Sequence, residues 1–145
     1  MFLWIEVSTF CYATESLIKV SSAISILAPG VELSEERKSG YHAVPIVMLS
    51  TRMTDGSEMD LFFERLGTDV IRELLRTIEA RVDDERVLHF RLDKQSLVLG
   101  KPMLANHGDS IVIKCKLKSM TGSSAIEDLR SFFGKSGVHP IAPNI

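Results

Sequence analysis

Hydrophobic and polar positions alternate along the chain with two different periods, which indicate both strands and helices. Apolar residues at every second position are typical of a half-buried strand, and apolar residues three or four positions apart are typical of a half-buried helix. The pattern predicts strands at residues 3–12, 31–34, 43–53, 85–92 and 109–118, and helices that begin near residues 14, 57, 68 and 124.

Polar residues before the periodic apolar runs predict where the helices begin, because their side chains can accept hydrogen bonds from the first free backbone N–H groups. A turn is expected at Ser39-Gly40, between two of the strands. The predicted caps are Thr14 for the first helix, Ser57 with Asp60 for the second, and Thr68 or Asp69, after a break at Gly67, for the third.

Strands with one apolar and one polar face, separated by helices, predict an α+β fold with an antiparallel sheet and helices packed mainly on one face. The 145 residues contain no internal repeat and no obvious linker between domains. We therefore expect a single domain over residues 1–135, followed by a loosely ordered tail at residues 136–145.

Composition and cysteine usage are those of a folded cytoplasmic protein. Hydrophobic residues make up 45% of the chain and charged residues 25%, and no apolar run approaches the ~18 residues of a membrane span. The apolar start lacks the basic residues of a signal peptide. Cys11 and Cys115 lie far apart without metal-site spacing, so we expect two small buried side chains and no cofactor or metal.

Charge is distributed unevenly between the two parts of the chain. Residues 1–85 contain 8 Lys and Arg against 15 Asp and Glu, whereas residues 86–145 contain 9 against 4. The polar faces of two C-terminal strands carry much of this positive charge, and adjacent strands would join them into one basic plate that attracts a polyanion. A solvated face kept soluble by lysines is the alternative. The side chains concerned are His89, Arg91, Lys114, Lys116 and Lys118.

Common catalytic motifs are absent from the sequence. It has no GxxxxGK[ST] loop, GxGxxG turn, HExxH helix or GxSxG elbow, and its four histidines stand singly. Asp83, Asp84 and Glu85 could hold a divalent cation for a nuclease, but three consecutive residues point in different directions, which favours a solvated turn. The sequence therefore indicates a non-catalytic protein.

Residues 80–101, ARVDDERVLHFRLDKQSLVLGK, resemble the signature region of an archaeal family of predicted RNA-binding proteins, often described as predicted exosome subunits. Residues 81–84 are similar to the acidic turn of that family, and residues 91–95 to its RLDKQ core. The resemblance implies a curved antiparallel sheet with helices on one face, similar to the large-subunit ribosomal protein that contacts 5S RNA. It also implies RNA as a partner, with exosome-related or ribosome-related proteins as further partners.

Two interpretations of the RLDKQ segment are compatible with each other. In the structural one, Asp93 caps a short helix and Gly100 ends it in a conformation that other residues resist. In the functional interpretation, Arg91 and Lys94 are exposed and bind phosphates, while Gln95 forms a hydrogen bond with a base edge or a ribose 2′-hydroxyl.

A protein–protein adaptor or a self-associating domain, such as a homodimer, remains the alternative to RNA binding. The isoelectric point near 6.1 favours it, because dedicated RNA-binding proteins are commonly more basic.

Overall fold

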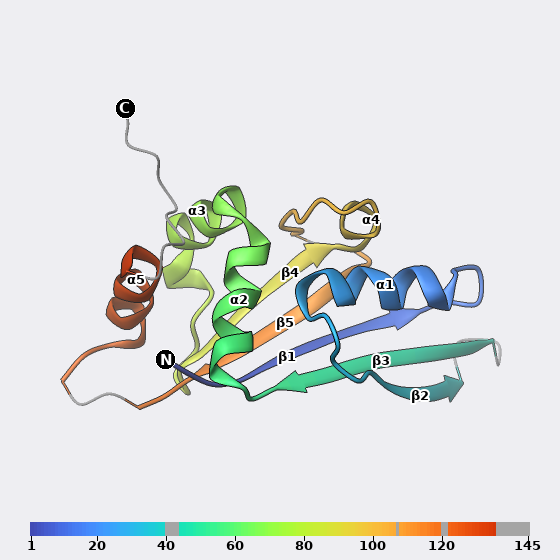
Figure 1. Ribbon diagram of the computed structural model, residues 1–145, viewed down its shortest axis with the longest axis horizontal. Coiled ribbons are helices and arrows are strands. Elements are labelled where there is room, and N and C mark those ends of the chain that lie inside the picture. Colours follow the sequence, from blue (N-terminus) through green and yellow to red (C-terminus); the bar gives the residue numbers. More distant parts are fainter. Residues whose placement is uncertain (40–43, 107, 120–121, 136–145) are drawn as a thin grey trace.

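One antiparallel sheet, covered on one face by helices, forms the protein (Figure 1). A sheet with helices on one face confirms the predicted α+β class. The computed structural model describes residues 1–39, 44–106, 108–119 and 122–135. The strands of the described residues are β1 (Phe2–Cys11), β2 (Ser34–Ser39), β3 (Pro45–Met53), β4 (Val87–Asp93) and β5 (Ser110–Leu117).

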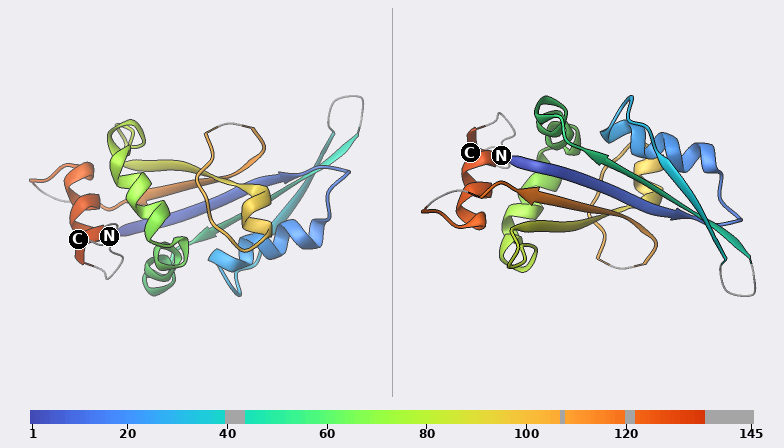
Figure 2. Two further views of the ribbon diagram at one scale, coloured as in Figure 1. Left: turned by 90° about the horizontal axis from the view of Figure 1, so that it is seen from above. Right: turned by 90° about the horizontal axis from the view of Figure 1, so that it is seen from below.

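The strands follow the order β2-β3-β1-β5-β4, so the first strand of the chain lies at the centre of the sheet. All of the helices except α5, which follows the last strand, lie in the connections between strands. Figure 2 shows that the helices gather on one side and leave the strands in front when the sheet is seen from below. They are α1 (Leu17–Leu27), α2 (Gly56–Leu66), α3 (Thr68–Arg76), the 3₁₀ helix η2 (Ile78–Ala80), α4 (Lys94–Val98) and α5 (Ala125–Lys135).

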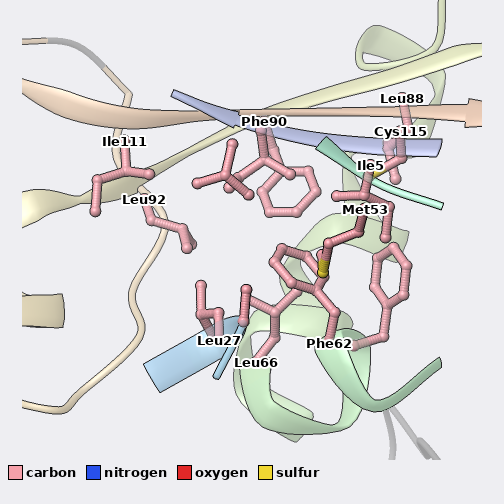
Figure 3. Packing of buried hydrophobic residues seen from close by; sticks show 14 of the residues in the cluster. Ile5, Leu27, Met53, Phe62, Leu66, Leu88, Phe90, Leu92, Ile111 and Cys115 are labelled. Carbon is pink, nitrogen blue, oxygen red and sulfur yellow. The ribbon is translucent and has the colours of Figure 1, made fainter. Parts of the chain in front are cut away.

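The hydrophobic core lies between the sheet and the helices. Every second residue of β1, β4 and β5 is buried, and each long helix buries one apolar side against these strands. In Figure 3, Leu27 of α1 and Leu66 of α2 point toward Leu92 and Ile111 of the sheet. Side-chain burial of this kind supplies about 1.5–3 kcal/mol for each large apolar residue.

Aromatic rings close the core at the end of the sheet where the chain begins. Phe2 of β1 stacks on Phe63 of α2 with ring centroids 4.9 Å apart, and Phe132 of α5 meets Phe2 edge-on at 5.3 Å. Phe133 contacts Phe63 at 5.3 Å. These contacts hold α5 on the core although it follows the last strand.

An ion pair fixes the start of α5 to the sheet. Arg86 donates to Asp128 Oδ2 at 2.5 Å and to the carbonyl of Lys118 at 2.7 Å. Ser123 Oγ donates to the other oxygen of Asp128, and these hydrogen bonds from Ser123 and Arg86 lower the pKa of its carboxyl group. Arg86 has a φ of 61°, a left-handed backbone value that is uncommon for a residue with a side chain.

The predicted helix caps at Thr14 and Ser57 are wrong. Ser16 caps α1, because its extended backbone lets Oγ accept from the N–H of Lys19 at 3.3 Å. Asp55 caps α2 and accepts from the Glu58 N–H at 3.1 Å. In each case the cap is the residue directly before the first helical position, which the apolar period alone locates only approximately.

The break between α2 and α3 lies at Gly67, as predicted, but neither Thr68 nor Asp69 caps α3. Gly67 is itself the N-cap, with φ of 88°, and Thr68 is already helical. A side chain other than glycine rarely adopts this backbone conformation, so the glycine permits the abrupt change of direction.

The second strand lies later in the chain than predicted. The predicted strand at residues 31–34 shares only Ser34 with β2, which the charged segment SEERKS forms. This strand pairs with β3, with Ser34 opposite Ser50 and Lys38 opposite Ile46. An edge strand with little burial on either face does not need an apolar alternation, and its charges discourage pairing with other chains. Gly40 of the expected turn and the tail at residues 136–145 lie outside the described residues.

A matched pair of leucines in α2 tests the position of the core. Leu66→Ala should lower the free energy of unfolding by about 2–5 kcal/mol, because Leu66 is buried against the sheet. Leu61→Ala should lower it by about 1 kcal/mol or less, because Leu61 is exposed on the same helix. Urea unfolding of both variants measures the difference, and equal losses would contradict the assigned orientation of α2.

Candidate nucleic-acid interface

Basic side chains of β4 and β5 share the face of the sheet that the helices leave open. The two strands are neighbours, and His89 lies directly opposite Lys114. Arg91 lies opposite Val112, which is on the same open face. The expected adjacency of the two strands is confirmed, and the alternation of each strand places these side chains away from the core.

A row of charged side chains crosses the open face from β3 to β4. Arg52 pairs with Glu6, which is the cross-strand neighbour of both Arg52 and Lys114. At the other end of the row, His89 Nε2 lies 2.8 Å from Asp83 Oδ2. This contact, followed by the hydrogen bond from the N–H of Val87, lowers the pKa of the Asp83 carboxyl group.

Among the cations of β4 and β5, Lys114 and Arg91 keep the most freedom to bind an external anion. Within the described part of the chain, Lys114 is exposed and has no hydrogen-bond or ion-pair partner. Among the described residues, Arg91 is also exposed and donates only to Ser110 Oγ, at 3.2 Å, which leaves most of its guanidinium N–H groups for other acceptors.

Two further lysines follow Lys114 along β5 and just past its end. Lys116 is half-buried, and its Nζ donates to the carbonyl of Glu85, so one of its three donors is already used. Lys118 is exposed just beyond the end of β5. Their positive charge extends the basic side chains toward the end of the sheet nearest α5.

Three adjoining hollows, of about 360, 310 and 280 Å³, lie over the open face. All three have Val112 in their lining, and the first two share Lys114. The second and third share Arg91. The hydroxyl groups of Ser8 and Ser50 add polar atoms to the first hollow. The hollows therefore lie side by side on the open face, with cations in their lining.

Aromatic side chains also lie on this face, and the sequence analysis missed them. Trp4 is half-buried beside Arg52, whose guanidinium lies 4.5 Å from the ring centroid. Phe10 and Tyr12 are 42% and 40% exposed. The alternation of the first strand already contains the signal. Ile5, Val7 and Cys11 are buried, and Phe10 lies an odd number of positions from each of them, so its side chain faces the opposite side of the sheet.

Lys94 is fully buried, so the expectation of an exposed phosphate contact is wrong. Its Nζ donates to the carbonyl of Phe10 at 2.6 Å and to Glu15 Oε1 at 3.0 Å. It also lies 2.8 Å from Asp109 Oδ2. The ammonium group is thus surrounded by acceptors from three separate segments, because α4 starts at Lys94 and directs its side chain inward under the end of β1.

The other residues of the RLDKQ segment divide between structure and surface. Asp93 caps α4 as predicted, accepting from the N–H of Ser96 at 2.9 Å, and Gly100 follows the helix with φ of 84°. Gln95 is exposed on α4, which packs against α1 in the helical layer. The structure therefore separates Gln95 from Arg91, which lies on the open face.

The acidic turn at residues 83–85 holds its own backbone together. Asp83 Oδ1 accepts from the N–H groups of Glu85 and Val87 at 2.9 and 3.0 Å. Within the described residues, no three His, Cys, Asp or Glu side chains form a group that could hold a metal ion. Both cysteines are free and buried, as expected, and burial raises the pKa of the Cys115 thiol.

Substitution of Lys94 tests the buried network. Lys94→Met should lower the free energy of unfolding by about 3–5 kcal/mol, because Glu15 and the carbonyl of Phe10 lose their charged donor. The exposed Lys101→Met is the matched control and should leave stability unchanged. Thermal or urea unfolding measures both, and a Lys94→Met protein as stable as the control would disprove the structural role.

Titration of Asp93 tests its capping role. Hydrogen bonds from the hydroxyl and N–H of Ser96 lower its pKa in the folded state. The group therefore stabilises the fold fully above the unfolded Asp pKa of about 3.9, and this stabilisation is lost as pH falls through the lower folded value. Asp93→Asn can still cap the helix but does not titrate, so it should lose less stability below pH ~4 than the wild type. Urea unfolding at several pH values measures this loss. Identical pH profiles of the two proteins would refute the capping role of the Asp93 carboxylate.

Comparisons with known proteins identify the family and agree with this fold. A family model described as RNA binding matches residues 4–117. The chain is 28% identical over 125 residues to the RNA-binding protein PAB1135 of Pyrococcus abyssi, covering 79% of this chain and 81% of that protein. It is 29% identical over 104 residues to a UPF0201 protein of Methanosarcina acetivorans, covering 68% of this chain and 63% of the relative.

Among solved structures, Mth689 of Methanothermobacter thermautotrophicus, a DUF54 protein, superposes with a TM-score of 0.80 and 32% identity. The match covers 90% of this chain and 97% of that structure. The matched region of the family model contains the whole sheet except the two terminal residues of β1. The chain therefore belongs to the RNA-binding family that includes these DUF54 and UPF0201 proteins.

Proposed function

We propose that the protein binds RNA through the open face of its sheet, with Arg91, Lys114 and Lys116 as the central phosphate contacts. The observation that carries this proposal is the pair of exposed cations, Arg91 and Lys114, that line the second hollow together. His89 flanks them on β4, and Lys118 lies just beyond the end of β5.

The chemistry of this face suits RNA better than a small anion. Several cations spaced along two strands neutralise successive phosphates, which releases counterions and gives affinity without a closed pocket. The serine hydroxyls of the first hollow can form hydrogen bonds with a ribose 2′-hydroxyl, the group that distinguishes RNA from DNA. A contact from Gln95 requires an RNA that continues past the end of β4 to the helical layer.

The proposed role is non-catalytic. Asp83, the best-placed acidic residue beside the cations, already bonds two backbone N–H groups and His89, which leaves its carboxylate engaged in structure. We further propose that the protein acts with RNA processing or degradation machinery related to the exosome, for which the support is the resemblance of residues 80–101.

Two other expectations stay predictions. A cytoplasmic location is one of them, and the structure adds only that none of the described helices has the length and apolar character to cross a bilayer. Self-association into a homodimer is the other. Light scattering of the purified chain over a range of concentrations would test it.

A salt series tests the RNA-binding face. A variant with Arg91→Gln, Lys114→Gln and Lys116→Gln should bind single-stranded RNA more weakly than the wild type. The slope of log affinity against log salt should become shallower by about 2, since each phosphate contact contributes about 0.7. Fluorescence anisotropy with labelled RNA and matched DNA measures both quantities.

The matched control removes the same number of charges from the helical side. Lys19→Gln, Lys101→Gln and Arg130→Gln replace three exposed cations that do not lie on the open face. This control should retain the wild-type slope. Equal effects of the two triple variants would show that binding follows net charge and that the open face is not the site.

A further inference from the structure

Two neighbouring aromatic rings lie at one end of the open face. Phe10 ends the outward-facing row of β1, opposite Met48 of β3, and Tyr12 follows directly after the strand. The ring centroids lie 6.4 Å apart with an angle of 37° between the planes. Both rings are about two-fifths exposed and line the same hollow as Arg91.

The backbone beneath this pair is held rigidly. Lys94 Nζ donates to the carbonyl of Phe10 and lies 5.1 Å from the centroid of the Tyr12 ring. The N–H of Tyr12 donates to Glu15 Oε1 at 3.0 Å, and the N–H of Glu15 donates to the carbonyl of Tyr12 at 2.9 Å. Rings that are ordered before binding lose little conformational entropy when a ligand stacks on them.

The charge around the rings suits a nucleotide. Asp109 also lines this hollow, and its carboxylate lies 2.8 Å from Lys94 Nζ, which it shares with Glu15, so its negative charge is only partly offset. Among the described residues, Arg91 donates only to Ser110 Oγ, and it lines the same hollow. The aromatic rings can take a base while this guanidinium, on the side away from Lys94, takes its phosphate.

We propose that Phe10 and Tyr12 stack the bases of a single-stranded stretch of RNA whose phosphates contact Arg91 and Lys114; this inference rests on the RNA-binding function proposed above. Phe10 on β1 and Arg91 on β4 are separated by two strand spacings across the sheet and by two residues along the strands. The distance between them is therefore roughly 12 Å. That separation is short enough for neighbouring nucleotides of one strand.

Single-stranded RNA is the form that can use both parts of the surface. In a duplex the bases stack on one another and their faces are covered, so exposed rings gain little. In a single strand every base offers a face, and stacking on an aromatic side chain is largely independent of sequence. The basic side chains alone would not distinguish the two forms, because both carry phosphates.

The test compares ring removal with ring retention. Phe10→Ala and Tyr12→Ala should each weaken binding of a short labelled single strand by about 5- to 150-fold, the range that corresponds to loss of one stacked base. Phe10→Trp should retain binding. The salt slope should stay that of the wild type, because no phosphate contact is removed, and affinity for the duplex of the same sequence should not change.

The control is Ile18→Ala, which removes a large exposed apolar side chain, 78% exposed, from α1 in the helical layer. Circular dichroism and thermal unfolding establish that each variant is folded. The proposal is overturned if the aromatic variants bind the single strand as the control does, or if they weaken single strand and duplex equally.

The remaining outcomes separate this inference from the function on which it rests. Salt-dependent RNA binding that is indifferent to Phe10 and Tyr12 would retain RNA binding and refute the stacking platform. A wild-type protein that binds neither form of RNA at low salt would refute both. Unchanged RNA affinity together with loss of self-association in Phe10→Ala would identify the rings as a protein contact and refute the platform.

Discussion

Burial of one face of the sheet beneath the helices determines the position of every other feature. Side chains in a strand alternate, so once Ile5, Val7 and Ile113 are committed to the core, their neighbours Glu6 and Lys114 must lie on the open face. A shift of one residue in the register would reverse all of these positions and place charges in the core. The basic face is therefore maintained by the same apolar contacts that stabilise the fold.

The buried Lys94 is the polar counterpart of this apolar constraint. Its ammonium group joins the end of β1, the start of α1 and the loop before β5 through Phe10, Glu15 and Asp109. Removing a charge from water is costly, and the cost is offset only where several acceptors surround it. Lys94 of the RLDKQ core thus acts from inside the protein, while Arg91, three residues earlier in the same core, reaches the surface.

Local electrostatics differ from the overall charge of the protein. The net charge is −2, yet the open face exposes Lys114 and Arg91 beside an acid, Glu6, that is already paired with Arg52. A polyanion approaching this face meets cations whose charge is not cancelled nearby, and the Debye length of ~8 Å at physiological salt limits the influence of more distant acids. A mildly acidic isoelectric point is therefore compatible with an RNA-binding face.

Local periodicity and side-chain chemistry were enough to predict the fold class, the inward and outward residues of the main strands, and the burial of both cysteines. The sequence also located Asp93 and Gly100 correctly, since caps and left-handed turns depend on a few adjacent residues. Three features emerge only in the folded chain: β1 lies between β3 and β5, Lys94 is buried, and Phe10 lies on the same face as Arg91. These features depend on contacts between residues some 80 positions apart, such as Lys94 with Phe10 and Glu15, and no local pattern encodes which distant partner completes a charge or shares a face.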